Sequence, residues 1–184
     1  APRRGSIQTV GNQGAKEIMA LAQERRLPIR IRVADASDAP MIYSDWLKSY
    51  HSQNKAIPKA VMSKIHRQVV GRLLGEAHTV VAVVDLPDLE DEFCGWLCAD
   101  RTDRFFICHW GYVKREYRTF GVMTALLNAF DYNRGEPTFL SHDFALRKEL
   151  PRHNFQLVPH LCHEGGLEQI TKLYNGEFNA VSEA

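Results

Sequence analysis

The segment Val113–Leu127 reads VKREYRTFGVMTALL, and its order of residue types decides the fold prediction. An apolar run ends at Val113, a polar turn follows, and an amphipathic helical pattern begins at Gly121. A helix start offers unpaired N–H groups and the positive end of the helix dipole, which together bind anions such as phosphate. A glycine there lets the backbone approach a ligand closely. The segment therefore predicts either an anion-binding turn or an ordinary turn glycine before a core helix.

The composition is that of one globular domain. The chain has 184 residues, of which 45% are hydrophobic and 24% are charged, and its formal net charge is +1. This balance gives no general attraction to nucleic acid or to an anionic membrane, and two isolated arginine pairs, at 3–4 and 25–26, are typical of a solvated surface. No apolar run approaches the roughly 20 residues that span a bilayer. The first residues lack the apolar core of a signal peptide.

Cysteine usage indicates the compartment. The four cysteines show neither a CxxC pair nor a disulfide framework, so we expect reduced, buried thiols in a cytoplasmic protein. The pair of histidines in HLCH, 160–163, lies on a predicted strand that would send successive side chains to opposite faces. We therefore predict no metal site.

Hydrophobic periodicity predicts a chain of alternating helices and strands. Helices are expected at 15–26, 38–52, 59–77, from 121 to about 130, and loosely at 167–178, with Asp35 and Ser37 as candidate N-caps of the second. Strands are expected at 29–33, 79–85, 93–100, 105–113, 138–146 and 155–164, the fifth running into a short helix that Pro151 ends. This order predicts an α/β fold with a mixed central sheet and helices on both faces. The domain would span 28–165, between an N-terminal arm with a short helix (1–27) and a C-terminal extension (166–184).

The element order and the segment 113–127 resemble the GNAT superfamily of acyl-CoA N-acyltransferases. That family's consensus at the central strand, V-D-P-E-Y-R-G-K-G-I-G-T-A-L-L, aligns with Val113–Leu127, and its signature R/Q-x-x-G-x-G/A falls on Arg118, Gly121 and Met123. IRVADASDAP (31–40) is similar to the family's first strand and turn, and FCGWLCAD (93–100) to its third strand, with Gly95 in the usual place. The resemblance covers about 29–160 in element order and is close in sequence over 113–127 alone.

The resemblance implies acetyl-CoA as co-substrate. Backbone groups of the turn would hold its pyrophosphate, which gives the cofactor-binding set Val113, Arg118, Thr119, Phe120, Gly121, Val122, Met123 and Thr124. Two of these depart from the family pattern: Met123 replaces a second small residue, and Phe120 replaces a residue that is frequently polar or basic.

Acyl transfer to an amine needs a base for the amine and a proton for the leaving thiolate. Alternation on the strand 105–113 puts residues 105, 107, 109, 111 and 113 on one face, and the resemblance implies that a base on this strand points into the substrate cleft. His109 is the candidate base, since its ordinary pKa of about 6.5 suits the task. The alternative is a buried, hydrogen-bonded structural histidine. Tyr112 and Glu116 are further candidates, acting through water or lining the cleft.

Two functions follow from the resemblance. The first is transfer of an acetyl group to an amine on a small molecule or a protein. The second is a non-catalytic GNAT-fold binding or assembly module, because alignment on Phe155 puts Leu150 where the family's proton-donating tyrosine stands. IYSDWLKSY (42–50) is similar to some bacteriophage-encoded chains, so a structural role in a virion, or a protein partner or second copy bound through the N-terminal arm, belongs to this second reading.

Overall fold

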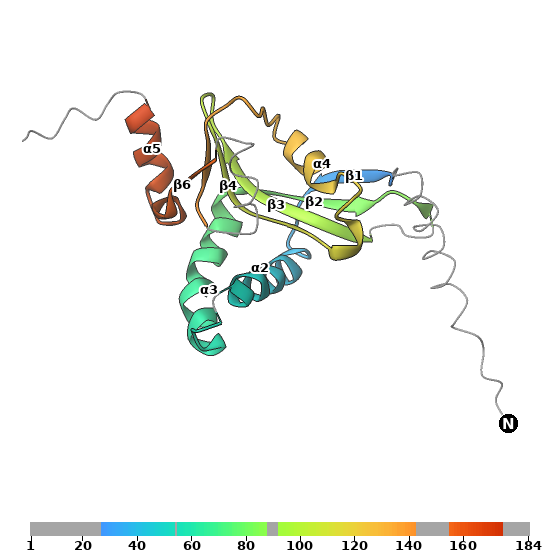
Figure 1. The fold of residues 1–184 in the computed structure, drawn as a ribbon, viewed down its shortest axis with the longest axis horizontal. Coiled ribbons are helices and arrows are strands. Elements are labelled where there is room, and N and C mark those ends of the chain that lie inside the picture. Colours follow the sequence, from blue (N-terminus) through green and yellow to red (C-terminus); the bar gives the residue numbers. More distant parts are fainter. Residues whose placement is uncertain (1–26, 54, 88–91, 143–154, 175–184) are drawn as a thin grey trace, which may run out of the picture.

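The structure is a computed structural model, and it describes residues 27–53, 55–87, 92–142 and 155–174. Over these ranges the chain forms a mixed sheet flanked by helices, which confirms the predicted α/β class (Figure 1). The arm, the helix expected at 15–26 and the short helix expected before Pro151 lie outside the described residues. Leu150, which the alignment on Phe155 puts at the family's tyrosine, also lies outside them.

The sheet contains six described strands, ordered as they occur in the chain. The first four pair antiparallel, and β4, β5 and β6 pair parallel. Their bounds are β1 (Ile29–Val33), β2 (His78–Val84), β3 (Phe93–Arg101), β4 (Phe106–Val113), β5 (Thr138–Leu140) and β6 (Phe155–Leu157). The change from antiparallel to parallel pairing therefore occurs at β4, the strand that leads into the segment 113–127.

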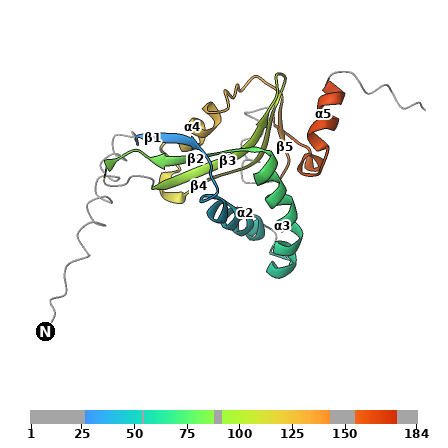
Figure 2. The same ribbon diagram turned by 180° about the vertical axis from the view of Figure 1, so that it is seen from behind.

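Helices cover both faces of the sheet. The pair α2 (Ala39–Gln53) and α3 (Lys59–Glu76) lies on one face, and α4 (Val122–Asn128) lies on the other (Figures 1 and 2). The last helix, α5 (Gly166–Tyr174), packs Ile170 against Phe105 and Phe139 beside the parallel strands. None of the described helices is long and apolar enough to cross a bilayer.

The strand predicted at 155–164 is wrong in its second half. β6 ends at Leu157, and a 3₁₀ turn, η4 (Pro159–Cys162), follows it. Pro159 has no N–H to give to a ladder, so the strand cannot continue through it. The histidines of HLCH therefore lie on or beside this turn.

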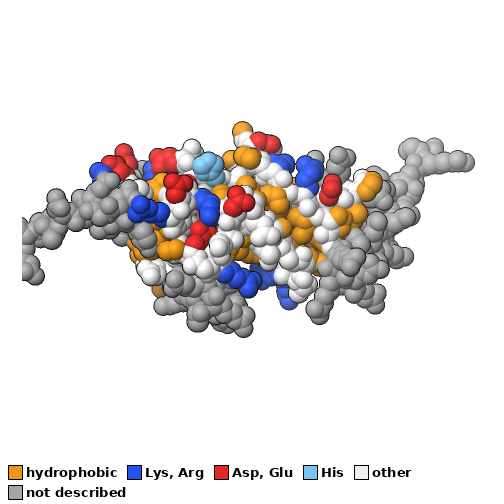
Figure 3. Space-filling model, turned by 90° about the horizontal axis from the view of Figure 1, so that it is seen from above, with side chains coloured by type: hydrophobic (Ala, Val, Ile, Leu, Met, Phe, Trp, Pro, Cys, Tyr) orange, Lys and Arg blue, Asp and Glu red, His pale blue; other side chains and the backbone are white. Residues whose placement is uncertain are grey.

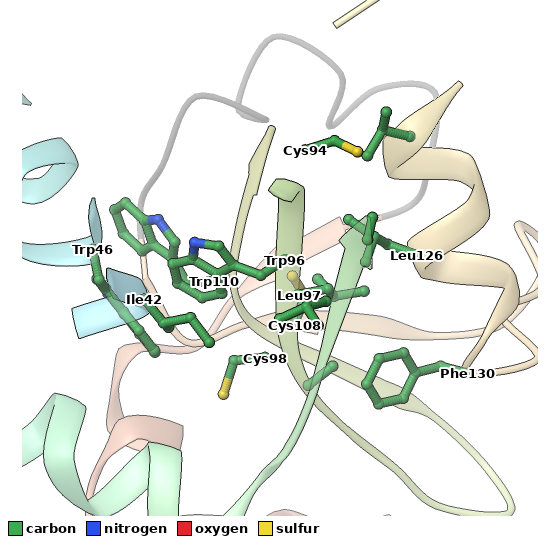
Figure 4. Close-up of a cluster of buried hydrophobic side chains, with 14 of the residues drawn as sticks. Ile42, Trp46, Cys94, Trp96, Leu97, Cys98, Cys108, Trp110, Leu126 and Phe130 are labelled. Atoms are coloured by element: carbon green, nitrogen blue, oxygen red, sulfur yellow. The ribbon is translucent and has the colours of Figure 1, made fainter. Parts of the chain in front are cut away.

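The core fills both sides of the sheet, which explains the nearly continuous apolar runs of β2 and β3. On one side Trp46 of α2 stacks on Trp110 with ring centroids 5.7 Å apart and lies 5.4 Å from Trp96. On the other side Leu126 of α4 and Phe130 are buried (Figure 4). The sheet is thus held from both faces, and the positions of β4 side chains are fixed by packing.

An ion pair fixes the entry into α2. Arg32 of β1 donates from both terminal nitrogens to the buried carboxylate of Asp38, at 2.6 and 2.9 Å. Asp38 immediately precedes the helix and also accepts from the Asp35 amide. The carboxylate of Asp35 instead accepts from the amide and hydroxyl of Ser37. Neither predicted N-cap therefore caps the helix, because Asp35 is used in this local turn.

All four cysteines are free thiols. Cys94, Cys98 and Cys108 are buried, as predicted, and Cys162 is half-buried. On the face shown in Figure 3, acidic and basic side chains are interspersed, with no large patch of one sign. This agrees with the near-neutral charge of the chain.

Candidate functional site

A β-bulge interrupts β4 at the candidate base. Cys98 of β3 pairs with Trp110, and the next residue, Ala99, pairs with Cys108, so His109 is the extra residue. A bulge re-aims the side chains that follow it. His109 and Trp110 both face the α2 side, whereas Gly111 lies against Met123 of α4. The prediction that residues 105, 107, 109, 111 and 113 share one face of the sheet is therefore wrong from Gly111 onward.

His109 is buried and hydrogen-bonded through both ring nitrogens. Its side chain is 2% exposed. Nε2 lies 2.9 Å from Oδ2 of Asp100 in β3, and Nδ1 lies 2.9 Å from Oγ of Ser141, just after β5. Ser141 Oγ in turn lies 2.7 Å from Nδ1 of His142. Four polar side chains, three of them buried and Asp100 partly exposed, thus form one line where the sheet turns parallel.

Aromatic rings surround one end of this line. The His142 ring centroid lies 5.6 Å from Trp46, 5.8 Å from Trp110 and 5.9 Å from Tyr50. His66 of α3 packs on Tyr50, with centroids 4.1 Å apart. Burial, followed by the nearby His109, lowers the pKa of His142 to about 3. The His142 ring is therefore neutral in the folded protein near neutral pH.

The strands β4 and β5 part beside the same line. Their parallel pairing comprises three residue pairs, the last being Cys108 with Leu140. Two further bonds flank these pairs, from the Phe106 amide to the Pro137 carbonyl and from the Ser141 amide to the Cys108 carbonyl. β4 continues for five more residues, and no described strand pairs with it on that side. The sequence of β5 thus delivers Ser141 and His142 to the point of divergence.

The backbone of the free part of β4 has a defined direction. The Lys114 amide bonds to the Cys94 carbonyl of β3, so the backbone groups of Tyr112 also point toward β3. Those of Gly111 and Val113 therefore point toward the opposite edge, where β5 has departed. Arg118 Nε donates to the Val113 carbonyl at 3.1 Å. This edge is open among the described residues except for that one contact.

The turn after β4 is anchored by Tyr117 and ends at a left-handed glycine. A 3₁₀ turn, η2 (Arg115–Tyr117), buries the Tyr117 side chain, whose pKa is raised to about 12, first by burial and then by Glu92. Gly121 has φ 76° and ψ 12°, a conformation that favours glycine. α4 begins at Val122, as predicted. The glycine is thus required by the backbone of this turn.

Most amides at the end of the turn and the start of α4 lack backbone partners in the described part of the chain. Only Phe120 among residues 119–124 donates to a backbone carbonyl outside α4, that of Tyr117. Gly121, the N-cap of α4, has no side chain with which to cap the helix. Thr119, Gly121 and Thr124 are exposed, and Val122 is buried. Met123 packs its thioether over Gly111 of β4, so the side chain that departs from the family pattern rests on the sheet.

The two other candidate catalytic side chains lie apart from the buried line. Tyr112 is half-buried, and its pKa is raised by burial and then by Asp45 of α2. Glu116 is exposed on η2. The structure therefore brings His109 together with three residues that the sequence did not single out, Asp100, Ser141 and His142. In the sequence, Asp100 is only an aspartate near the end of a strand, and Ser141 and His142 are only a polar pair after the short run TFL. Both patterns are too common to indicate a site.

Two hollows lie elsewhere in the described part. One, of about 460 Å³, lies between α2 and α3 beside Tyr43 and Arg67. The other, of about 440 Å³, lies where β1 and α3 end, beside Asp35 and His78. Neither includes a predicted site residue. No cluster of three or more metal-ligating side chains is found in the described ranges.

Several solved structures are similar to this chain in arrangement. A possible acetyltransferase from Clostridium difficile 630 shares 16% identity over 85% of this chain and 94% of its own, with a TM-score of 0.42. The aminoglycoside N-acetyltransferase AAC(6')-Iy, solved with CoA, shares 13% over 86% of this chain and 92% of its own, with a TM-score of 0.36. YjaB from Escherichia coli shares 18% over 55% of this chain and 63% of its own, with a TM-score of 0.39.

These proteins include acetyltransferases, the class that the resemblance predicted. Their TM-scores lie below 0.5 and their identities below 25%. No protein-family model matches the chain, and no curated protein matches it. The features that bear on function are therefore the chain's own strands, the turn after β4 and the buried side chains.

Proposed function

We propose that the chain is an N-acetyltransferase that moves an acetyl group from acetyl-CoA to an amine. One observation carries this proposal: β4 parts from β5 shortly before a turn in which the amides of Thr119 and of residues 121–124 have no backbone partner among the described residues. An open strand edge and a set of free amides then lie along one continuous stretch, 109–124. An extended ligand with amides at one end and phosphates at the other fits both.

The open edge suits the amide-bearing arm of CoA. Free N–H and C=O groups on a strand edge bind an extended partner as an added strand would. The N–H and C=O of Gly111 and the N–H of Val113 supply these groups here. The thioester would lie deeper, toward the divergence of β4 and β5, where His109 and Ser141 are held.

The turn suits the pyrophosphate. The amides of Thr119 and Gly121–Thr124 present partial positive charge, and Arg118 adds a full one. A Cβ added at position 121 would meet no atom within 4 Å, so the backbone there faces open space. Val113 contributes indirectly, because its carbonyl accepts from Arg118 Nε and so positions that guanidinium.

The chemistry needs one proton to move. The amine nitrogen attacks the thioester carbon, the C–S bond breaks, the nitrogen loses a proton and the thiolate gains one. His109 is the candidate base on β4, and its contact with Asp100 favours the tautomer with hydrogen on Nε2, which leaves a lone pair on Nδ1. The base would act through Ser141, because Ser141 occupies that lone pair.

Release of free thiol from acetyl-CoA tests the proposal directly. The wild-type chain is incubated with acetyl-CoA and a panel of primary amines, beside His109→Ala and the control His51→Ala, a histidine in the last turn of α2. We expect amine-dependent thiol release by the wild type and the control, and a loss of about 10²-fold or more in His109→Ala. Acetyl-CoA binding without release for any amine would favour the non-catalytic binding module instead.

A further inference from the structure

We propose that the line His142–Ser141–His109–Asp100 is a proton store, which takes the amine proton at His142, holds the charge at His109 and returns the proton to the leaving thiolate. This inference rests on the proposed function, which supplies the proton. It assigns His142 as the side chain that exchanges protons with the reacting groups. Ser141 and Asp100 become positioning residues.

The contacts of the line are all of hydrogen-bond length. Asp100 Oδ2 to His109 Nε2 measures 2.9 Å, His109 Nδ1 to Ser141 Oγ 2.9 Å, and Ser141 Oγ to His142 Nδ1 2.7 Å. His109, Ser141 and His142 are each 5% exposed or less. Burial of this kind keeps water from competing for the contacts.

The donors along the line can point in one direction only. A carboxylate accepts and cannot donate, so Asp100 fixes the hydrogen of neutral His109 on Nε2. His109 Nδ1 then accepts the single hydrogen of the Ser141 hydroxyl. Since that hydroxyl has no second hydrogen, His142 must donate its own from Nδ1. The resting line therefore leaves His142 Nε2 with a lone pair, while the ring N–H of His142 also meets the backbone of His109.

The two ends of the line differ in surroundings. His142 lies among Trp46, Tyr50 and Trp110, with His66 behind Tyr50, and no carboxylate contacts it in the described part. His109 contacts the Asp100 carboxylate, which is 16% exposed and lies 3.8 Å from the exposed His78. A positive charge is therefore better held at His109 than at His142.

Each proton can be followed along the line. The amine nitrogen gives its proton to His142 Nε2, whose Nδ1 hydrogen passes to Ser141 Oγ while the serine hydrogen passes to His109 Nδ1. His109 is then an imidazolium paired with Asp100, and His142 is neutral again. Reversing the two shifts returns a hydrogen to His142 Nδ1 and makes that ring an imidazolium again, and the proton on its Nε2 then passes to the thiolate. No tyrosine is needed, which agrees with the leucine at position 150.

The resting tautomers are the first test. Nitrogen-15 NMR of the whole chain with labelled histidine rings, assigned with His109→Gln and His142→Gln, reports which ring nitrogen carries hydrogen. We expect hydrogen on Nε2 of His109 and on Nδ1 of His142. Hydrogen on Nε2 of His142 in the resting protein would overturn the store, whatever the chain does with acetyl-CoA.

The second test breaks the line without removing an imidazole. Ser141→Ala should lower kcat about 10²-fold and leave the Kd for acetyl-CoA unchanged, and Ser141→Thr, which keeps the hydroxyl, should restore most of the rate. Thr138→Val is the matched control, because it removes another buried hydroxyl near Ser141, on β5. Full activity of Ser141→Ala, or an acetyl adduct on Ser141 by mass spectrometry, would overturn the store alone.

The two proposals fail in different ways. If the wild type does not bind acetyl-CoA, the proposed function fails, and the store loses its source of protons with it. If the wild type binds and acetylates an amine while Ser141→Thr is as slow as Ser141→Ala, only the store is wrong.

Discussion

The ε-methyl of Met123 lies 2.9 Å from the point where a Cβ on Gly111 would stand, so the first turn of α4 rests on β4 only because position 111 has no side chain. The thioether fills that space beside Leu97. A bulky residue in the helix and a glycine in the strand are thus one packing unit. Neither residue alone would reveal this in the sequence.

Gly111→Ala should lower the free energy of unfolding by about 1–2 kcal/mol, because the Met123 side chain must move. Met123→Ala should remove most of that penalty in a double-mutant cycle followed by urea unfolding. Gly95→Ala is the matched comparison, since its Cβ would lie 2.5 Å from the Tyr112 carbonyl oxygen, a backbone atom. Its larger penalty should not respond to Met123→Ala. Equal coupling in both cycles would contradict the packing.

Gly121 should resist β-branched substitution for a backbone reason. Its φ of 76° costs an ordinary residue about 1–2 kcal/mol, although no atom lies within 4 Å of an added Cβ. Gly121→Val should therefore lower stability by at least that amount, and Gly121→Asn by clearly less, because asparagine tolerates this conformation. Thermal unfolding of the two variants measures the difference, and equal stabilities would show that the left-handed geometry is wrong.

Much of the fold follows from local patterns. The strands around Val81 and Leu97 are short apolar runs between turns, and the helix after Gly121 has a start signal and an apolar stripe. The segment 113–127 carried the resemblance because the turn imposes its residue types locally. These features depend on neighbours in sequence, so the sequence alone predicted them.

The buried line could not be predicted in the same way. The bulge at His109 exists only in the register between β3 and β4, and strict alternation gave the wrong face for Gly111. Ser141 reaches His109 only because β5 pairs parallel with β4 from 32 residues further along the chain. The apolar pattern of residues 155–164 predicted one strand, although Pro159 within it has no N–H for strand pairing.

Acid should destabilise the protein through His142. Its pKa falls from about 6.5 in the unfolded chain to about 3 in the fold, so its stabilising contribution is complete above pH 6.5 and is lost as the pH falls toward 3. The free energy of unfolding should drop by about 1.4 kcal/mol per pH unit across this window. His66, whose pKa is also lowered by burial, adds to the same slope.

Urea unfolding at a series of pH values measures that slope. His142→Gln cannot be protonated and should flatten the curve by about one proton between pH 6 and pH 4. An unchanged slope in His142→Gln would mean that another group is responsible for the acid sensitivity.

Thiol reactivity should follow burial. Burial raises the pKa of Cys94 and Cys98 to about 12 and raises that of Cys108 as well, so none of these three forms thiolate at neutral pH. Cys162 is half-buried and should react first with iodoacetamide, and the other three should react only on unfolding. Peptide mass spectrometry after a short exposure identifies the labelled residue. Early labelling of Cys98 would contradict the packing against α3.

Calorimetry with acetyl-CoA tests the central claim most directly. The free edge of β4, the amides after Arg118 and the left-handed Gly121 together predict micromolar binding, about −8 kcal/mol. Gly121→Asn, which keeps the backbone but adds a side chain at the turn, should weaken binding at least tenfold. Wild-type heat at micromolar acetyl-CoA, lost in that variant, is the expected result. No heat and no thermal shift at millimolar acetyl-CoA would contradict the account, and the chain would then be an assembly module on this fold.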